Sequence, residues 1–351
     1  MQIQLTKNRI VGENASPYII AELGSNHNGD MNLAKKLIEA AKKSGADCVK
    51  FQSWSKDTIF SRKAYEDNYF LADDYRNRDD YTMEEIVDKY AISEQELLEM
   101  KHYADKIGID CTSTPFSKRE VDFLVDELKA DFIKVASMDV NNYPFLSYIA
   151  KKGKPIVIST GLSTLSEINM AIETIENAGN KNIVILHCVA IYPPDDDEIN
   201  LRNLDTLSKI YPYPVGFSDH TLGISVPIAA IAKGACVIEK HFTLDKNMEG
   251  WDHKISTTPD ELKEIVAGAK KVHAALGTGR IYQEENEERI NSFRRSIVAA
   301  REIQKDEIFT EDMLDFKRPG TGLPPGNISF ILGKKARCNI PYDKIITLDD
   351  F

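Results

Sequence analysis

Two histidines lie at the carboxyl ends of consecutive predicted strands, where both side chains could bind the same metal ion. His220 follows a strand-like apolar run in GFSDHT, and His241 ends the next run in EKHFT. Neighbouring strands lie ~4.8 Å apart, so the two imidazoles can reach one divalent ion. A carboxylate or a substrate oxygen would complete the ligands, and Glu22 and Asp252 are the candidate carboxylates. The alternative is that both histidines are ordinary polar strand ends.

Two lysines follow apolar strand runs, where a lysine has to lie close to the core. Lys50 ends CVK and Lys134 ends FIK. Together with serines at nearby strand ends, they are typical of a cradle for phosphate or carboxylate. A Schiff-base lysine is the rival use of either residue, and the spacing does not separate the two roles. The serines of this set are Ser137, Ser159 and Ser218.

The composition excludes some classes of function. The chain has 351 residues, of which 42% are hydrophobic and 28% charged, a balance typical of a folded globular protein. Its formal charge of -11 argues against non-specific binding to nucleic acid, which needs a basic surface. An anionic substrate would therefore need a locally cationic site, and Lys50 and Lys134 would provide one.

The opening residues and the cysteines bear on the compartment. MQIQLTKNRIVG lacks the basic-then-apolar pattern of a signal peptide, and no apolar run approaches the ~20 residues of a membrane span. The five cysteines are an odd number without closely spaced pairs. These observations predict a cytoplasmic protein that binds neither membrane nor nucleic acid.

Short β-branched runs alternate with amphipathic helical stretches through most of the chain. Stretches such as MNLAKKLIEAAKKSGA repeat apolar residues at i, i+3 and i+4, and several end at glycine. Eight such strand–helix units predict a (β/α)8 TIM barrel over residues 1–279. A doubly wound open sheet is the alternative, but the chain has no GxGxxG or GxxxxGK[ST] motif. The predicted strands are 18–22, 48–52, 109–113, 132–137, 155–160, 183–188, 214–218 and 236–241.

Each predicted strand starts with apolar residues and finishes on polar ones. In a TIM barrel all carboxyl ends open on one face, where the loops build the active site. The alternative is that polar residues simply mark strand ends everywhere. The polar ends include Glu22, Lys50, Gln52, Ser113, Thr114, Lys134, Ser137, Ser159, Thr160, His187, Ser218, Asp219, His220, Glu239, Lys240 and His241.

The pattern changes after Gly277. Residues 280–293 are highly charged and are predicted to form a linker or a short exposed helix. Residues 294–351 carry a weak internal repeat, in which DEIFT at 306–310 recurs as DKIIT at 343–347. Two copies are too few for a solenoid and predict a small, mainly β module with two-fold character.

Read together, these segments resemble the sialic acid synthase family, the phosphoenolpyruvate-condensing synthases of N-acetylneuraminate, legionaminate and pseudaminate. The similarity covers essentially the whole chain. It runs in family order through IAELGSNHNG, ADCVKFQS, STPFS, IKVAS, NNYP, VISTGLS, LHCVAIYP, GFSDHTLG, EKHFTLD, DHKIS, RRSIVAA and KRPGTG. The C-terminal module is similar to the family's antifreeze-like (SAF) domain, which covers the partner's barrel mouth in a domain-swapped homodimer.

The resemblance implies a transferase that condenses phosphoenolpyruvate, an N-acylated hexosamine such as N-acetylmannosamine, and water. The products would be phosphate, released by C–O cleavage, and a nine-carbon 2-keto acid. It also implies that His220 and His241 bind Mn²⁺ or Mg²⁺, which polarises the sugar aldehyde, and that Glu22 is a catalytic acid or base. The implied substrate-binding residues are Lys50, Gln52, Thr114, Lys134, Ser137, Asp139, Ser159, Tyr192, Ser218, Asp252 and Arg318.

Three positions depart from the family pattern. Ala190 stands where relatives commonly carry Asn or Ser, Trp251 replaces a proline beside the sugar-binding Asp252, and Asp139 replaces a common Glu. These departures leave the reaction type unchanged. They leave the acceptor open among sialic, legionaminic and pseudaminic acid precursors.

Two other functions are compatible with the same residues. A Schiff-base aldolase or lyase acting on similar sugars would use Lys50 or Lys134 as its nucleophile. A non-catalytic carbohydrate-binding or structural protein would require the polar strand ends to be accidental.

Overall fold

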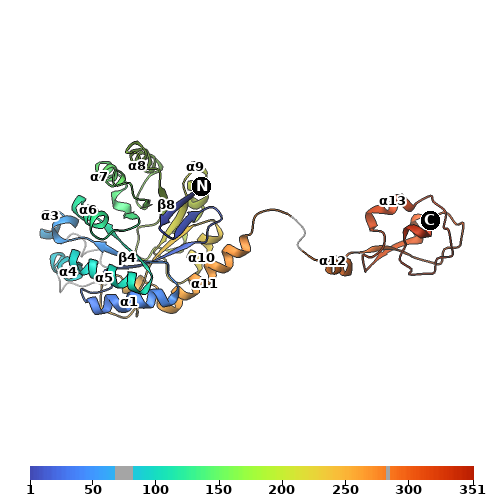
Figure 1. Ribbon diagram of the computed structural model, residues 1–351, viewed down its shortest axis with the longest axis horizontal. Helices are drawn as coiled ribbons and strands as arrows, with labels where there is room; N and C mark the ends of the chain where they lie inside the picture. The colour runs from blue at the N-terminus through green and yellow to red at the C-terminus, as the bar shows by residue number, and fades with distance from the viewer. Residues whose placement is uncertain (68–81, 282–284) are drawn as a thin grey trace. The chain divides into compact units, whose positions relative to one another are not determined.

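The computed structural model describes residues 1–67, 82–281 and 285–351, and the chain divides into two compact units, Met1–Gly277 and Thr278–Phe351 (Figure 1). In the first unit, eight parallel strands form one sheet in the order β5-β4-β3-β10-β9-β8-β7-β6. Thr112 Oγ1 on β5 donates to Phe132 O, just before β6, at 3.0 Å, so the sheet is nearly closed. The predicted TIM barrel is therefore confirmed. The strands are β3 (Tyr18–Gly24), β4 (Cys48–Ser53), β5 (Asp110–Pro115), β6 (Ile133–Val135), β7 (Ile156–Ser159), β8 (Ile183–Cys188), β9 (Val215–Asp219) and β10 (Val237–His241).

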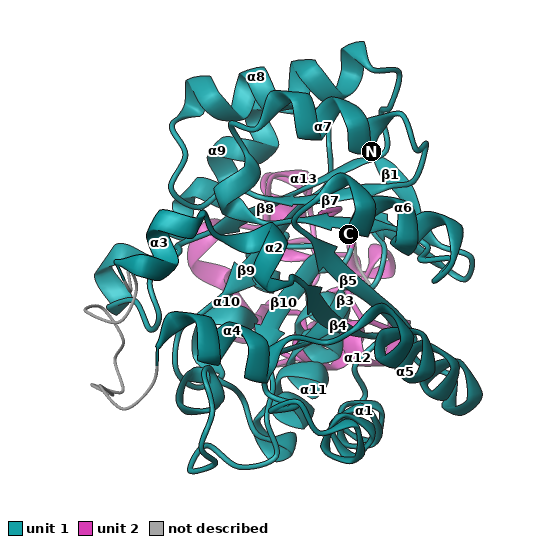
Figure 2. Ribbon diagram, turned by 90° about the vertical axis from the view of Figure 1, so that its left-hand side faces the viewer, with its two compact units in different colours: residues 1–277 teal, residues 278–351 magenta. Residues whose placement is uncertain are grey.

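Helices surround these strands in Figure 2. Several begin with a Ser or Thr whose side chain caps the helix, followed three residues later by Glu, as at Ser93, Thr164 and Thr258. Gly45 and Gly108 end their helices in the left-handed conformation, as the sequence predicts. The helices are α1 (Met31–Ser44), α2 (Lys56–Ile59), α3 (Arg62–Glu66), α4 (Met83–Tyr90), α5 (Glu94–Ile107), α6 (Lys118–Asp126), α7 (Tyr143–Ala150), α8 (Leu165–Asn177), α9 (Arg202–Ile210), α10 (Ser225–Ala232) and α11 (Pro259–Leu276).

A hairpin that the sequence analysis did not predict precedes the barrel. Its strands β1 (Gln2–Thr6) and β2 (Arg9–Gly12) pair antiparallel, and Leu5 and Val11 are fully buried in the main core. Arg9 forms an ion pair with Asp47, which lies immediately before β4. The hairpin therefore packs at the amino-terminal ends of the strands and leaves their carboxyl ends for the polar residues.

The second unit has a hydrophobic core of its own. The two repeat copies pair with each other, because Ile303 N donates to Ile340 O at 2.9 Å and Ile340 N donates to Ile303 O at 2.8 Å. Asp306 and Asp343 hold equivalent turns, each with a φ of 66°. The unit contains α12 (Glu287–Phe293), β11 (Ser296–Ala299), β12 (Leu314–Lys317) and α13 (Ile328–Ile331).

The predicted linker, 280–293, contains α12 and also covers residues 282–284, which lie outside the described residues. Of the helices within the described residues, none combines the length and apolar character needed to cross a bilayer.

Candidate active site

Strand alternation places the predicted polar residues inside the carboxyl end of the barrel. Along β10, Glu239 faces two lysines of other strands, Lys240 faces Asp219 of the neighbouring strand, and the ring of His241 lies beside that of His220. Successive side chains of a strand point to opposite faces. Glu239 and His241 therefore belong to the barrel interior, whereas Lys240 lies on the opposite face of the strand.

Four buried charges form the centre of the site. Lys50 forms an ion pair with Glu22 and lies 3.8 Å from Glu239 Oε2. Lys134 Nζ lies 3.5 Å from Glu239 Oε1. Each of the four residues is at most 6% exposed, so the two ammonium groups and the two carboxylates compensate one another in a region shielded from water.

Burial and mutual interaction set the charge states of this cluster. Burial raises the pKa of Glu22 to about 7, because the opposing effect of Lys50 only partly compensates it. For Glu239, burial acts in the same direction, but Lys134 and Lys50 outweigh it and lower the pKa. Glu22 is therefore the carboxyl of the cluster that can gain or lose a proton near neutral pH.

The lysines are surrounded by hydroxyl groups. Lys50 Nζ donates to Thr114 Oγ1 at 2.7 Å, and Lys134 Nζ donates to Ser159 Oγ at 2.7 Å. Ser218 Oγ donates to Glu239 Oε1 at 2.9 Å. Ammonium and hydroxyl donors gathered in this way can bind carboxylate or phosphate oxygens.

The two predicted metal-binding histidines lie side by side. Their ring centroids are 5.5 Å apart, and the ring of Tyr192 lies 4.2 Å from that of His220. His241 Nδ1 lies 3.8 Å from Asp252 Oδ2, and Gln52 Nε2 donates to Glu22 Oε1 at 3.1 Å. The aromatic, carboxylate and amide groups among the predicted substrate-binding residues thus lie beside the histidines and Glu22.

The histidine pair has the chemistry of a divalent metal site. His220 Nδ1 lies 2.8 Å from Val189 O, so this nitrogen donates a hydrogen bond and Nε2 is the nitrogen that could bind a metal. Burial acts to lower the pKa of His220, but contact with the Cys188 thiol outweighs it and raises the pKa. His241 Nδ1 is buried without a hydrogen bond to any described residue, and burial holds the pKa of His241 well below its usual range. No group of three or more His, Cys, Asp or Glu side chains within the described ranges is placed to hold a metal. Water or substrate oxygens would therefore have to complete such a site.

Three predicted site residues are not joined to this cluster by the contacts above. Ser137 Oγ accepts from Gly161 N at 3.0 Å in the adjoining loops, and Asp139 accepts from Asn142 Nδ2 at 2.9 Å. Arg318 belongs to the second unit, where its guanidinium lies 5.2 Å from the centroid of the Phe293 ring.

Glu239 is the central residue that the site prediction omitted. It connects Lys50, Lys134 and Ser218, although the sequence analysis noted it only as a polar strand end. Its position two residues before His241 is the signal that could have identified it, because residues i and i+2 of a strand share a face.

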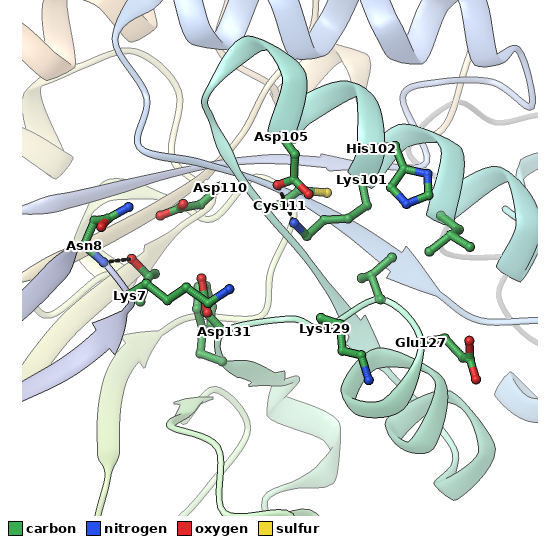
Figure 3. A pocket seen from close by; sticks show the side chains of 14 residues that line it. Lys7, Asn8, Lys101, His102, Asp105, Asp110, Cys111, Glu127, Lys129 and Asp131 are labelled. Atoms are coloured by element: carbon green, nitrogen blue, oxygen red, sulfur yellow. Dashed lines mark hydrogen bonds and ion pairs between the residues drawn. The ribbon is translucent and has the colours of Figure 1, made fainter.

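A separate cavity of about 360 Å³ lies at the opposite end of the barrel (Figure 3). It is formed by the turn of the β1–β2 hairpin, by α5 and by the segment leading into β6, and includes Lys7, Lys101 and Asp131. None of the predicted site residues lines it. The polar cluster and this cavity are therefore distinct features.

The fold is a (β/α)8 barrel, and its polar cluster lies at the carboxyl ends of the strands, where enzymes with this fold carry their active sites. The chain belongs to the NeuB family, whose model matches residues 37–281, and it carries a SAF domain at residues 294–351. The family resemblance and the C-terminal SAF domain inferred from the motifs are thus confirmed.

Proteins similar to the chain include two synthases with assigned activities. It is 43% identical to the N,N'-diacetyllegionaminic acid synthase of Campylobacter jejuni, over 93% of this chain and 98% of that protein. It is 36% identical to the human N-acetylneuraminate-9-phosphate synthase, over 99% of this chain and 96% of that protein. The chain is also similar to a crystal structure of the N-acetylneuraminic acid synthetase of Leptospira borgpetersenii in complex with citrate. The TM-score is 0.73 and the identity 31%, and the match covers 82% of this chain and 94% of that one.

Proposed function

We propose that the chain is a nonulosonate synthase, a transferase that condenses phosphoenolpyruvate with an N-acylated hexosamine and water. The observation that carries the proposal is the juxtaposition of a two-lysine cradle and a histidine pair in one buried barrel mouth. Membership of the NeuB family and the names of the relatives support the same reaction class.

The anionic groups of phosphoenolpyruvate would bind at the lysines. Lys50 and Lys134 supply fixed positive charge, and Thr114, Ser159 and Ser218 supply hydroxyl donors next to them. Fixed donors in a site shielded from water stabilise developing charge without having to reorganise during the reaction. This local cradle allows a chain with a formal charge of -11 to hold an anion.

The condensation would form one carbon–carbon bond and break one carbon–oxygen bond. C3 of phosphoenolpyruvate bonds to the aldehyde carbon of the open-chain sugar, and water supplies a new oxygen to C2. The bond between C2 and its phosphate-bridging oxygen then breaks, so that phosphate keeps this oxygen and C2 becomes the ketone. Both protons of the water have to move, one to the former aldehyde oxygen and one to the departing phosphate.

His220 and His241 would hold the divalent ion, with Mn²⁺ proposed before Mg²⁺. When bound, such an ion acts as a Lewis acid toward the aldehyde oxygen. Glu22 would hold or move a proton at the sugar end, because its pKa lies near neutral pH. Asp252, next to His241, would bind sugar hydroxyls, with Gln52 and Tyr192 lining the same end.

The Schiff-base alternative requires an uncharged lysine amine. Burial lowers the pKa of Lys134 more than Glu239 raises it, which is the observation that favours this alternative. Burial also acts on Lys50, but Glu22 and Glu239 outweigh it and raise the pKa of that lysine. A lysine paired with buried carboxylates is suited to binding an anion rather than to attacking a carbonyl.

Phosphate release with a panel of N-acyl hexosamines distinguishes the two reactions. We expect phosphate and a nine-carbon 2-keto acid only when phosphoenolpyruvate, Mn²⁺ and an accepted sugar are all present, and we expect EDTA to stop the reaction. The panel should contain N-acetylmannosamine, its 6-phosphate and a 2,4-diacetamido-2,4,6-trideoxyhexose. EDTA-insensitive turnover, together with a borohydride-trapped pyruvate adduct on Lys134, would instead establish the aldolase.

We further propose that the protein forms a domain-swapped homodimer in the cytoplasm. The loops after β6, β7, β8 and β9 expose large apolar side chains at the same end of the barrel as the site, and a partner subunit would shield them. The exposed side chains are Met138, Leu162, Ile191, Tyr192 and Leu222.

All five cysteines are free, which is compatible with the reducing compartment of the proposed cytoplasmic location.

Arg318 of the partner's SAF domain would contact the N-acyl group of the sugar. We therefore expect Arg318→Ala to raise the KM for the amino sugar about 10–100-fold, the equivalent of one charged hydrogen bond, while the KM for phosphoenolpyruvate changes little. Steady-state kinetics with each substrate varied in turn measures both constants. Arg301→Ala, which removes another arginine of the same unit, is the control. Equal changes in both KM values would remove the proposed role of Arg318.

A further inference from the structure

A buried ion pair joins the two residues that directly precede the histidines, on the face of the strands opposite the charged cluster. Lys240 Nζ lies 2.6 Å from Asp219 Oδ2, and both side chains are almost completely buried, at 1% and 0% exposure. Asp219 directly precedes His220, and Lys240 directly precedes His241. The two residues are also cross-strand partners, at the last paired position of β9 and β10.

The ion pair fixes the chain on both sides of His220. Lys240 Nζ donates a second hydrogen bond to Thr221 O at 2.6 Å. Asp219 Oδ1 in turn accepts a hydrogen bond from Thr221 N at 2.9 Å. Lys240 thus contacts the side chain of Asp219, the residue before His220, and the backbone carbonyl of Thr221, the residue after it.

His220 needs this support more than His241 does. The backbone of His241 is paired with β3, and its carbonyl also accepts from Thr257 N and Thr257 Oγ1, each at 2.7 Å. His220 instead lies just beyond the end of β9, where ladder pairing has stopped. The hydrogen bond between its ring and Val189 O then fixes the imidazole only if the backbone is held in place.

A stabilising role alone does not account for these two charges. Replacing a buried ion pair by apolar residues of similar size is often neutral or stabilising, because burying two charges is costly. A buried pair whose three contacts surround one residue is better suited to defining a geometry. The residue whose geometry it defines here is His220.

We propose that Lys240, through Asp219 and Thr221, is a positioning residue for the divalent metal site. The inference rests on the proposed function of His220 and His241 as metal-binding residues. Lys240 itself touches neither substrate nor metal. Its removal loosens the His220 segment and weakens metal binding, whereas the phosphoenolpyruvate cradle at Lys134 and Ser159, on β6 and β7, keeps its geometry.

Titration of free Mn²⁺ by electron paramagnetic resonance tests this inference without relying on turnover. We expect Lys240→Met to raise the Kd for Mn²⁺ about 10–100-fold, the usual effect of removing a group that orients a metal-binding histidine. At saturating Mn²⁺, the KM for phosphoenolpyruvate should stay within about two-fold of the wild-type value, and much of the lost turnover should return.

Lys240→Met leaves the Asp219 carboxylate buried without its partner, and this variant can fail to fold for that reason alone. The double variant Asp219→Asn/Lys240→Met removes both charges and keeps an oxygen to accept from Thr221 N. It should still bind Mn²⁺ more weakly than the wild type. Lys246→Met, which breaks the partly exposed Lys246–Glu261 pair, is the matched control and should leave the Kd unchanged.

Two outcomes would overturn the inference, and they are distinguishable. If the wild-type protein binds Mn²⁺ and the double variant binds it with the same Kd, the ion pair is purely structural and only this inference fails. If the wild-type protein binds no divalent ion, the metal site fails as well, and the proposed function fails with it.

Discussion

Replacing His241 by alanine is expected to abolish Mn²⁺-dependent phosphate release while leaving the barrel folded. The side chain ends β10 inside the barrel, next to His220, and its Nδ1 is buried without a hydrogen bond to a described residue. Loss of a Lewis acid at a developing alkoxide costs several kcal/mol, so we expect kcat to fall about 10³-fold or more. A coupled assay for phosphate, with Mn²⁺ and both substrates saturating, measures this loss.

The fold should tolerate the change because His241 contributes no hydrogen bond from Nδ1 and its backbone contacts remain. Circular dichroism and the thermal midpoint provide the check. His273→Ala on α11, which lies outside the site, is the control and should keep wild-type turnover. Unchanged phosphate release by His241→Ala would refute the assignment of this residue to the metal.

The second large effect is expected at Lys134, where activity and stability should both fall. Lys134→Met removes a cation from the proposed cradle, and the loss of one fixed donor of this kind costs about 10²–10³-fold in kcat/KM for phosphoenolpyruvate. The substitution also takes from Glu239 the lysine that lies 3.5 Å away. Lys50 then has to compensate both Glu22 and Glu239, and removing one partner of a buried ion pair lowers the free energy of unfolding by about 3–5 kcal/mol.

The double variant Lys134→Met/Glu239→Gln separates these two effects. It removes both charges and keeps an oxygen to accept the hydrogen bond from Ser218 Oγ. Urea denaturation should show most of the lost stability restored, whereas steady-state kinetics should show that the activity stays low. If the double variant regained wild-type kcat/KM, Lys134 would have only a structural role.

The barrel was predictable because its signal is local and repeated. Most predicted strands are short apolar runs followed by polar residues, and several helices carry their own start or stop signals, such as Thr164 with Glu167 or the terminal Gly108. The β1–β2 hairpin was not predicted. Its strands are short, and their burial depends on contacts with distant residues, such as that between Arg9 and Asp47.

The residues that gather at the barrel mouth were also largely predictable, but their pairing was not. Lys50, Lys134 and the two histidines each follow a strand, and a barrel brings all such ends together. That Glu239 lies between the two lysines depends on the inward direction of its side chain and on the diameter of the barrel. The same holds for Lys240 and Asp219, whose contact follows from the register of β10 against β9.

The fate of the bridging oxygen of phosphoenolpyruvate tests the central claim most directly. The protein would be incubated with Mn²⁺, the accepted N-acyl hexosamine and phosphoenolpyruvate labelled with ¹⁸O at the C2–O–P position, and both products would be analysed by mass spectrometry. C–O cleavage predicts phosphate that carries the label and an unlabelled nine-carbon 2-keto acid. Label retained in the keto acid, or no condensed product with any sugar of the panel, would contradict the proposed synthase reaction.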